Sequence, residues 1–384
     1  MAAARKRTPK VVDTRHDSLV LVLQGGGALG AYQAGVYEGM AEVGLAPDWV
    51  TGVSIGAINA ALIAGNPPER RVERLRAFWE RVSSGALPFP VPQLDALRAF
   101  WNGANAARFA TFGVPGFFRP RVPPPLLAVP GSDAALSFYD TTPLQHTLEE
   151  LVDFDLIAQR KVRVSLGAVN VRSGNSVYFD NHDASHGPIR AEHVRASGAL
   201  PPAFAPIVID GEPYWDGGIV SNTPLWYVLD DSPHMNALVV QVDLFSARGV
   251  MPTTLDQVLE RKKDIQYSSK TRFNTKRVRD LGEMRAALER LLEKLPPALR
   301  RDADVQRLGA LCDTGRITIA HLINRRLSHA AQSKDFEFSR ATVEELWAAG
   351  LEDVRRSVAN IATMKARKIG DGIQVFDLTL AQDA

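Results

Sequence analysis

The sequence predicts an α/β fold with a mostly parallel central sheet, and three observations support this prediction. The runs SLVLVLQ at 18–24 and DWVTGV at 48–53 are short and mainly apolar, as is typical of strands buried on both faces. A glycine-rich turn follows the first run, and a helical pattern follows each of them. Because strands that alternate with helices through short connections pair in parallel, this order favours an α/β sheet.

The remaining elements are predicted in chain order. Helices are expected at 31–43, 55–65 and 70–82, and the second ends at Gly65 before two prolines. A helix at 142–152 and a hairpin of strands 161–171 and 176–181 come next. A further strand is expected at 237–245. After about residue 250 helical patterns dominate, and strands are expected there at 316–323 and 373–378.

Residues 84–136 have a different composition from the rest of the chain. They hold nine prolines and seven aromatic residues. Because proline at this density resists regular structure, we expect little helix or strand here. The aromatic residues are too many for a solvated linker, so the insert is either a cover packed on the core or a partly exposed apolar lid.

Composition restricts the class of protein. With 384 residues, 45% of them hydrophobic, the chain can bury one large core or two smaller ones. The net charge of +2 argues against a nucleic-acid binder, and the single cysteine, Cys312, excludes an intrachain disulfide. The basic stretch 1–17 lacks an apolar segment behind its charges and is expected to be a flexible tail. No apolar run is long enough to span a bilayer, so we expect a cytoplasmic protein.

The segment LVLQGGGALG at 21–30 fits G-x-G-x-x-G, a pattern typical of dinucleotide sites. Such a site needs an acidic residue at the end of the second strand to hold the ribose. Asp48 is near the required spacing but stands at the start of that strand. The sequence therefore predicts no nucleotide cofactor.

The end of the second strand carries a different motif, Gly52-Val53-Ser54-Ile55-Gly56, which is G-x-S-x-G between a strand and a helix. In a nucleophile elbow, small neighbours allow the sharp turn that exposes the serine hydroxyl. The Ile55 amide and the helix N-terminus favour negative charge beside Ser54. Ser54 is therefore the candidate nucleophile, and a plain turn serine is the alternative.

With a candidate nucleophile nearby, the glycine-rich turn can also be interpreted as an oxyanion hole. Acyl transfer needs backbone amides aimed at the developing oxyanion. Gly25, Gly26, Gly27 and Ala28 can supply such amides, with Gly30 supporting the turn. Parallel pairing of the first two strands would bring both turns to the same edge of the sheet.

The base is predicted in YWDGGIVSNTP at 214–224. None of the eight histidines stands in a glycine-framed turn, but Asp216 is followed by Gly217 and Gly218. A carboxylate in an apolar setting can accept the serine proton if its proton affinity is raised. The alternative is a simple Asp-Gly turn. Asn222 and Ser197 are interpreted as turn and cap residues.

GGGALG, GVSIG and DGG, in this order and spacing, resemble the motifs of the patatin-like phospholipases. ASGALPPAFAPIVIDGEPYWDGG at 196–218 adds to the resemblance. It covers residues 18–245, and 246–384 resemble the C-terminal extension of some bacterial members. The resemblance implies a three-layer α/β/α fold and hydrolysis of lipid acyl esters by a Ser–Asp dyad without metal or cofactor. By position, Ser54 is the nucleophile and Asp216 the base.

Four points stay open at this stage. Many relatives carry a basic residue where this chain has Leu29, which weakens any specific claim for phospholipid headgroups. The acyl donor could instead be a neutral lipid, a storage polyester or a thioester. Three other functional classes also stay open: a histidine-assisted hydrolase, a nicotinamide oxidoreductase and a non-catalytic lipid-binding protein. The basic stretch 261–279 could contact anionic membrane, although a solvated helix face is the favoured interpretation.

Overall fold

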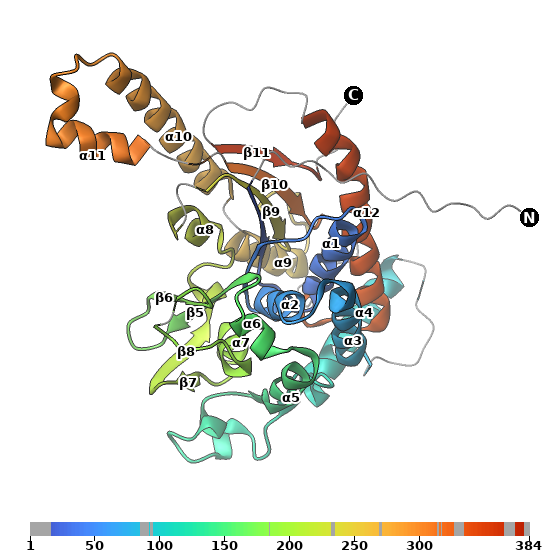
Figure 1. The fold of residues 1–384 in the computed structure, drawn as a ribbon. Helices are drawn as coiled ribbons and strands as arrows, with labels where there is room; N and C mark the ends of the chain where they lie inside the picture. Colours follow the sequence, from blue (N-terminus) through green and yellow to red (C-terminus); the bar gives the residue numbers. More distant parts are fainter. Residues whose placement is uncertain are drawn as a thin grey trace, which may run out of the picture.

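The centre of the molecule is one sheet to which both halves of the chain contribute (Figure 1). The structure is a computed structural model that describes residues 17–84, 92, 95–183, 185–231, 235–268, 271–312, 315, 317–325, 334–364 and 373–379. Within these residues the strand order is β11-β10-β9-β1-β2-β5-β8-β7, with β6 paired to β5. The strands are β1 (Ser18–Leu23), β2 (Trp49–Val53), β5 (Arg163–Asn170), β6 (Ser176–Asp180), β7 (Ile207–Ile209), β8 (Glu212–Asp216), β9 (Ala237–Asp243), β10 (Ile317–Ile323) and β11 (Ile373–Asp377).

Pairing in the sheet is mostly parallel, as predicted. All neighbours from β11 to β5 run parallel, and antiparallel pairing is confined to β5, β6, β7 and β8. β1 and β2 are direct parallel partners, so the glycine turn after β1 and the turn after β2 emerge at the same edge. The predicted α/β fold class is therefore confirmed.

Helices cover both faces of the sheet, which makes three layers. Their bounds are α1 (Ala31–Glu42), α2 (Ile55–Ala64), α3 (Arg71–Val82), α4 (Asp95–Phe112), α5 (Thr142–Leu151), α6 (Phe154–Ala158), α7 (Ala191–Ser197), α8 (Leu225–Asp231), α9 (Leu255–Tyr267), α10 (Thr271–Glu293), α11 (Ala303–Cys312) and α12 (Arg340–Met364). The larger core lies between the sheet and α1, α2, α3 and α12, and a smaller core lies under α8. No helix among the described residues is long and apolar enough to cross a bilayer.

The prediction of little regular structure in 84–136 is wrong for residues 95–112. They form α4, which runs through a stretch without proline because the nine prolines fall at 88–92 and 115–130. The high proline content of the insert as a whole does not reveal this proline-free stretch. Phe109 and Trp101 are buried on the core side of α4, whereas Phe100 and Phe112 are exposed, so α4 is a cover with an apolar outer surface.

The C-terminal extension contributes strands as well as helices. β10 pairs with β9, and β11 pairs with β10, so the extension continues the central sheet. α12 packs along α1, where Gly35 and Gly350 let the two helix backbones approach closely. The tail 1–16, most of the predicted 1–17 tail, lies outside the described residues.

Candidate active site

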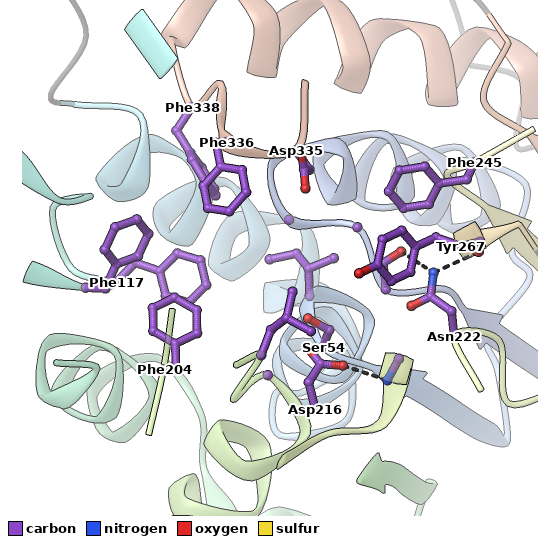
Figure 2. Close-up of a pocket in the computed structure, with 18 residues that line it drawn as sticks. Ser54, Phe117, Phe204, Asp216, Asn222, Phe245, Tyr267, Asp335, Phe336 and Phe338 are labelled. Atoms are coloured by element: carbon purple, nitrogen blue, oxygen red, sulfur yellow. Dashed lines mark hydrogen bonds between the residues drawn. The ribbon is translucent and has the colours of Figure 1, made fainter. Parts of the chain in front are cut away.

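Ser54 occupies a sharp turn between β2 and α2. Its backbone has φ 57° and ψ −123°, a conformation that side-chain-bearing residues rarely adopt and that costs on the order of 1–3 kcal/mol. The flanking glycines allow this turn. A Cβ on Gly52 would lie 2.3 Å from the Gly56 backbone, and one on Gly56 would lie 2.3 Å from the Leu23 carbonyl oxygen. The predicted elbow is therefore present, with its serine exposed toward a pocket (Figure 2).

Asp216 and Ser54 lie at the ends of strands that are separated by one strand, β5, in the sheet. Val53 on β2 is paired with Gly167 on β5, and the next β5 residue, Ala168, is paired with Asp216 on β8. A Cβ on Gly217 would lie 2.6 Å from the Gly167 carbonyl oxygen, so glycine is required for the chain to turn there. Figure 2 shows the side chains of Ser54 and Asp216 next to each other in the pocket, and a side-chain interaction with Ser54 acts to lower the pKa of Asp216.

The environment of Asp216 favours its protonated form. The side chain is buried, and this burial raises its pKa from 3.8 to about 6. Hydrogen bonds from Ser54 and from the Gly218 amide (2.7 Å) act in the opposite direction. A carboxylate of this pKa is still ionised at neutral pH and binds a proton more readily than an exposed aspartate.

The glycine turn after β1 lies on the other side of Ser54. Gly25, Gly26, Gly27 and Ile55 line the same pocket as Ser54 and Asp216. The Gly25 amide donates to the Asn222 carbonyl (3.1 Å). The amides of Gly26, Gly27 and Ile55 donate to no other residue in the described part of the chain. They are therefore free donors on residues that line the pocket.

The other predicted turn residues occupy supporting positions. Ala28 is buried and does not line the pocket, and Gly30 packs against Ile55 and Trp79. Gly218 lines the pocket beside Asp216. Leu29 is buried in the larger core and does not line the pocket.

Two residues interpreted as turn and cap residues hold the site together. The Ser197 hydroxyl donates to the Gly167 carbonyl (2.6 Å) and accepts from the Ser54 amide (3.0 Å). The Asn222 side-chain amide donates to the carbonyl oxygens of Gly25 and Tyr267, both at 3.0 Å. Ser197 thus holds the elbow, and Asn222 ties the glycine turn to the end of α9.

One wall of the pocket is aromatic. It comes from the insert (Phe117 and Phe118), from the segment between α7 and β7 (Phe204) and from the C-terminal extension (Phe336 and Phe338) (Figure 2). The rings of Phe117, Phe118, Phe204 and Phe338 contact one another, with centroids 5.5 Å apart for Phe117 and Phe118 and 5.8 Å apart for Phe117 and Phe338. The pocket encloses about 660 Å³, including solvent at its mouth. Such a wall suits a hydrocarbon chain.

The extension reaches the pocket through residues 334–338, here called the strap. The carbonyl of Asp335 rests on Gly27, where φ is +56° and a Cβ would come 2.2 Å from that oxygen. The Asp335 carboxylate pairs with Lys263 (2.7 Å), and Lys334 pairs with Asp264 (2.6 Å) and Glu260 (3.1 Å). Ion pairs with α9 therefore hold the strap over the glycine turn. Nothing in the local sequence of the strap signalled this role.

Histidine does not occur among the described residues that line the pocket. His321 is buried, with Nε2 2.7 Å from Asp243, and does not line the pocket either. His16, His234 and His329 lie outside the described residues.

The basic stretch 261–279 is only partly described, because the side chains of 269–279 lie outside the described residues. Arg261 donates to the Ser246 and Ala247 carbonyls, and Lys263 pairs with Asp335. These two cations are therefore engaged within the protein.

Two family models match this sequence. A family model described as "Patatin-like phospholipase" matches residues 21–229, and a second, described as "Patatin phospholipase", matches residues 265–368. VipD from Legionella pneumophila is a similar solved structure, with 13% identity, a TM-score of 0.34, and coverage of 91% of this chain and 72% of that one. The ExoU–SpcU complex from the type III secretion system of Pseudomonas aeruginosa gives 16% identity, a TM-score of 0.27, and coverage of 92% and 78%. No curated protein matches the sequence. Because the first family model spans more than half of the chain, from the first strand to α8, the protein belongs to the patatin-like phospholipase family and carries a C-terminal extension.

Proposed function

We propose that this protein is a serine acyl hydrolase that cleaves lipid acyl esters with Ser54 as nucleophile and Asp216 as base. The observation that carries the proposal is the position of Ser54, on a strained turn, beside the buried carboxylate of Asp216, whose pKa is raised to about 6. The free amides of Gly26, Gly27 and Ile55 beside Ser54 support an oxyanion hole. The Gly25 amide is left out because Asn222 already accepts its hydrogen bond.

Each residue has one task in the proposed reaction. Asp216 accepts the hydroxyl proton while Ser54 Oγ attacks the ester carbonyl carbon, and the amides bind the resulting oxyanion. When the tetrahedral intermediate collapses, the C–O bond to the alcohol breaks and Asp216 returns the proton to the leaving oxygen. Asp216 then deprotonates a water molecule that attacks the acyl-enzyme, and the proton passes back to Ser54 as the acid departs. A single oxyanion donor contributes about 3–4 kcal/mol in such reactions.

The pocket supports recognition of the acyl chain more than of a phosphate. Asp216 and Asp335 are the charged side chains among the described lining residues, and Asp335 is paired with Lys263. No lysine or arginine among the described residues lines the pocket. An acyl donor without phosphate near the scissile bond, such as a neutral lipid or polyester, therefore remains a second candidate beside a phospholipid.

The proposal is tested by labelling the full chain with a fluorophosphonate and measuring hydrolysis of one acyl chain presented as phospholipid, diacylglycerol, thioester and p-nitrophenyl ester. We expect Ser54→Ala to abolish labelling and turnover on every substrate. Ser176→Ala, a change at an exposed serine on β6, should alter neither.

The rival classes give different results in the same experiment. A histidine-assisted hydrolase would lose as much activity on one His→Ala change as on Ser54→Ala. A non-catalytic lipid-binding protein would bind the lipids without labelling at Ser54, and an oxidoreductase would bind nicotinamide nucleotide. Any of these results would overturn the proposal.

A further inference from the structure

A cluster of exposed apolar side chains lies on residues 121–138, here called the apolar loop. Val122 is 92% exposed, Leu126 96%, Leu127 77% and Val129 74%. The loop projects beyond α5 at the bottom of Figure 1. A cluster of exposed aliphatic side chains marks a surface that contacts a membrane or another protein.

The base of the loop is rigidly held. β3 (Arg119–Pro120) pairs with β4 (Tyr139–Asp140), and the Arg121 amide donates to the Phe138 carbonyl (3.0 Å). The Phe138 amide in turn donates to the Pro202 carbonyl (3.2 Å). Three successive prolines, 123–125, restrict the backbone just before the two leucines. The loop therefore presents its apolar side chains in a fixed position.

The base of the loop is continuous with the pocket wall. Phe117 and Phe118 line the pocket and directly precede β3. The Phe118 ring lies 4.8 Å from Tyr139 of β4 and 5.4 Å from Phe204 of the pocket. A lipid chain that leaves the surface touched by the loop therefore has an aromatic path toward Ser54.

The loop and the two strands at its base carry no net charge. Residues 119–140 contain two arginines, Arg119 and Arg121, and two aspartates, Asp133 and Asp140. Arg119 pairs with Asp140 (2.9 Å), whereas Arg121 donates to the neutral Ser137 hydroxyl (2.8 Å). An exposed aliphatic tip on a loop without net charge is complementary to the acyl chains of a lipid bilayer.

We propose that the apolar loop is the membrane contact of this protein: Leu126 and Leu127 insert into the interface of a lipid bilayer and bring the pocket mouth to the lipid. The insertion follows from the loop alone, and only the passage of substrate from the bilayer to Ser54 rests on the proposed function. The contact is distinct from the basic stretch 261–279.

The test uses the full chain with Ser54→Ala, so that vesicles stay intact, and sedimentation with vesicles of phosphatidylcholine and phosphatidylglycerol in equal amounts. We expect binding, and we expect Leu126→Asp with Leu127→Asp to weaken it on the order of a hundredfold, because two leucines lose burial and two negative charges are added. Met284→Asp with Leu291→Asp is the matched control, because both residues are 59% exposed on α10.

Two outcomes would overturn the inference: the Ser54→Ala protein does not sediment with these vesicles, or the loop variant sediments as well as it does. Measuring ester hydrolysis distinguishes a failure of the membrane contact from a failure of the proposed function. In otherwise wild-type protein, the loop variant should hydrolyse a soluble short-chain ester at the normal rate and lose turnover on vesicles. Binding without any ester hydrolysis would leave the membrane contact standing and reject the hydrolase.

Discussion

The Ser54 backbone amide donates to two atoms of Ser197, the backbone carbonyl oxygen (3.1 Å) and the side-chain hydroxyl (3.0 Å). This contact fixes the elbow from its N-terminal side, and the Ser197 hydroxyl continues to the Gly167 carbonyl on β5 (2.6 Å). Ser54 is therefore positioned against the strand that lies between it and Asp216.

Ser197→Ala should separate positioning from fold stability. It removes the hydroxyl but leaves the Ser197 carbonyl, so we expect kcat to fall about tenfold with KM unchanged and fluorophosphonate labelling to slow in parallel. Loss of the buried hydrogen bonds should lower the free energy of unfolding by about 1–3 kcal/mol. Ser83→Ala is the matched control, because Ser83 is also buried and its hydroxyl bonds to a backbone carbonyl (2.7 Å). If both variants lose activity equally, Ser197 has only a structural role.

Asp216→Asn should remove activity and increase stability. Because the folded protein holds the pKa of Asp216 at about 6, above its ordinary 3.8, the ionised carboxylate opposes folding at neutral pH. The difference corresponds to about 3 kcal/mol at 1.36 kcal/mol per pH unit. The increase in the free energy of unfolding of Asp216→Asn over the wild type should be absent below about pH 4, grow up to about pH 6 and stay constant at higher pH.

Denaturant unfolding of both proteins at pH 4 and pH 8 measures this gain, and ester hydrolysis measures the loss of activity. Asp230→Asn, at an exposed position on α8, should change neither quantity. A variant that keeps its turnover, or that is less stable at pH 8, would show that Asp216 does not act as described.

The pH dependence of the reaction should follow the same group. Asp216 must be ionised to accept the serine proton, so kcat/KM should rise with pH through one ionisation, reach half its maximum near pH 6 and level off about one pH unit higher. Initial rates on an uncharged short-chain ester give this profile. An acidic limb near pH 4 would mean that the buried carboxylate does not control the rate.

Phe336→Ala should change which acyl chains are accepted. Phe336 lines the pocket and is only partly buried, whereas Phe338 is buried against Phe109 and Phe117, so removing the Phe336 ring opens the mouth without emptying the core. We expect the preferred chain length to increase, measured as kcat/KM for p-nitrophenyl esters from acetate to palmitate. Phe112→Ala, at a residue 72% exposed and outside the pocket, should leave the profile unchanged. The same profile in both variants would remove Phe336 from chain selection.

The sequence predicted most of the fold because its signals are local. The apolar strand at 18–24, the small residues around Ser54 and the Asp-Gly-Gly turn each specify a short backbone conformation, and parallel β1–β2 pairing brings the first two turns together. The helix α4 was missed because prolines on both sides of it dominated the composition of the insert.

The residues around the dyad could not be predicted in the same way. Asn222 acts through carbonyl oxygens of Gly25 and Tyr267, which are 197 and 45 residues away along the chain. The strap acts through ion pairs with α9 and through an aromatic wall shared with Phe117. These roles depend on long-range packing of common residue types, and no local spacing encodes them.

The most direct test of the account is the site of covalent labelling by a fluorophosphonate, identified by mass spectrometry in the wild-type, Asp216→Asn and Ser197→Ala proteins. We predict one adduct, on Ser54, formed rapidly in the wild type, about tenfold more slowly in Ser197→Ala and not detectably in Asp216→Asn. An adduct on another residue, or labelling of Ser54 at an unchanged rate without the Asp216 carboxylate, would contradict the claim that this carboxylate activates that serine.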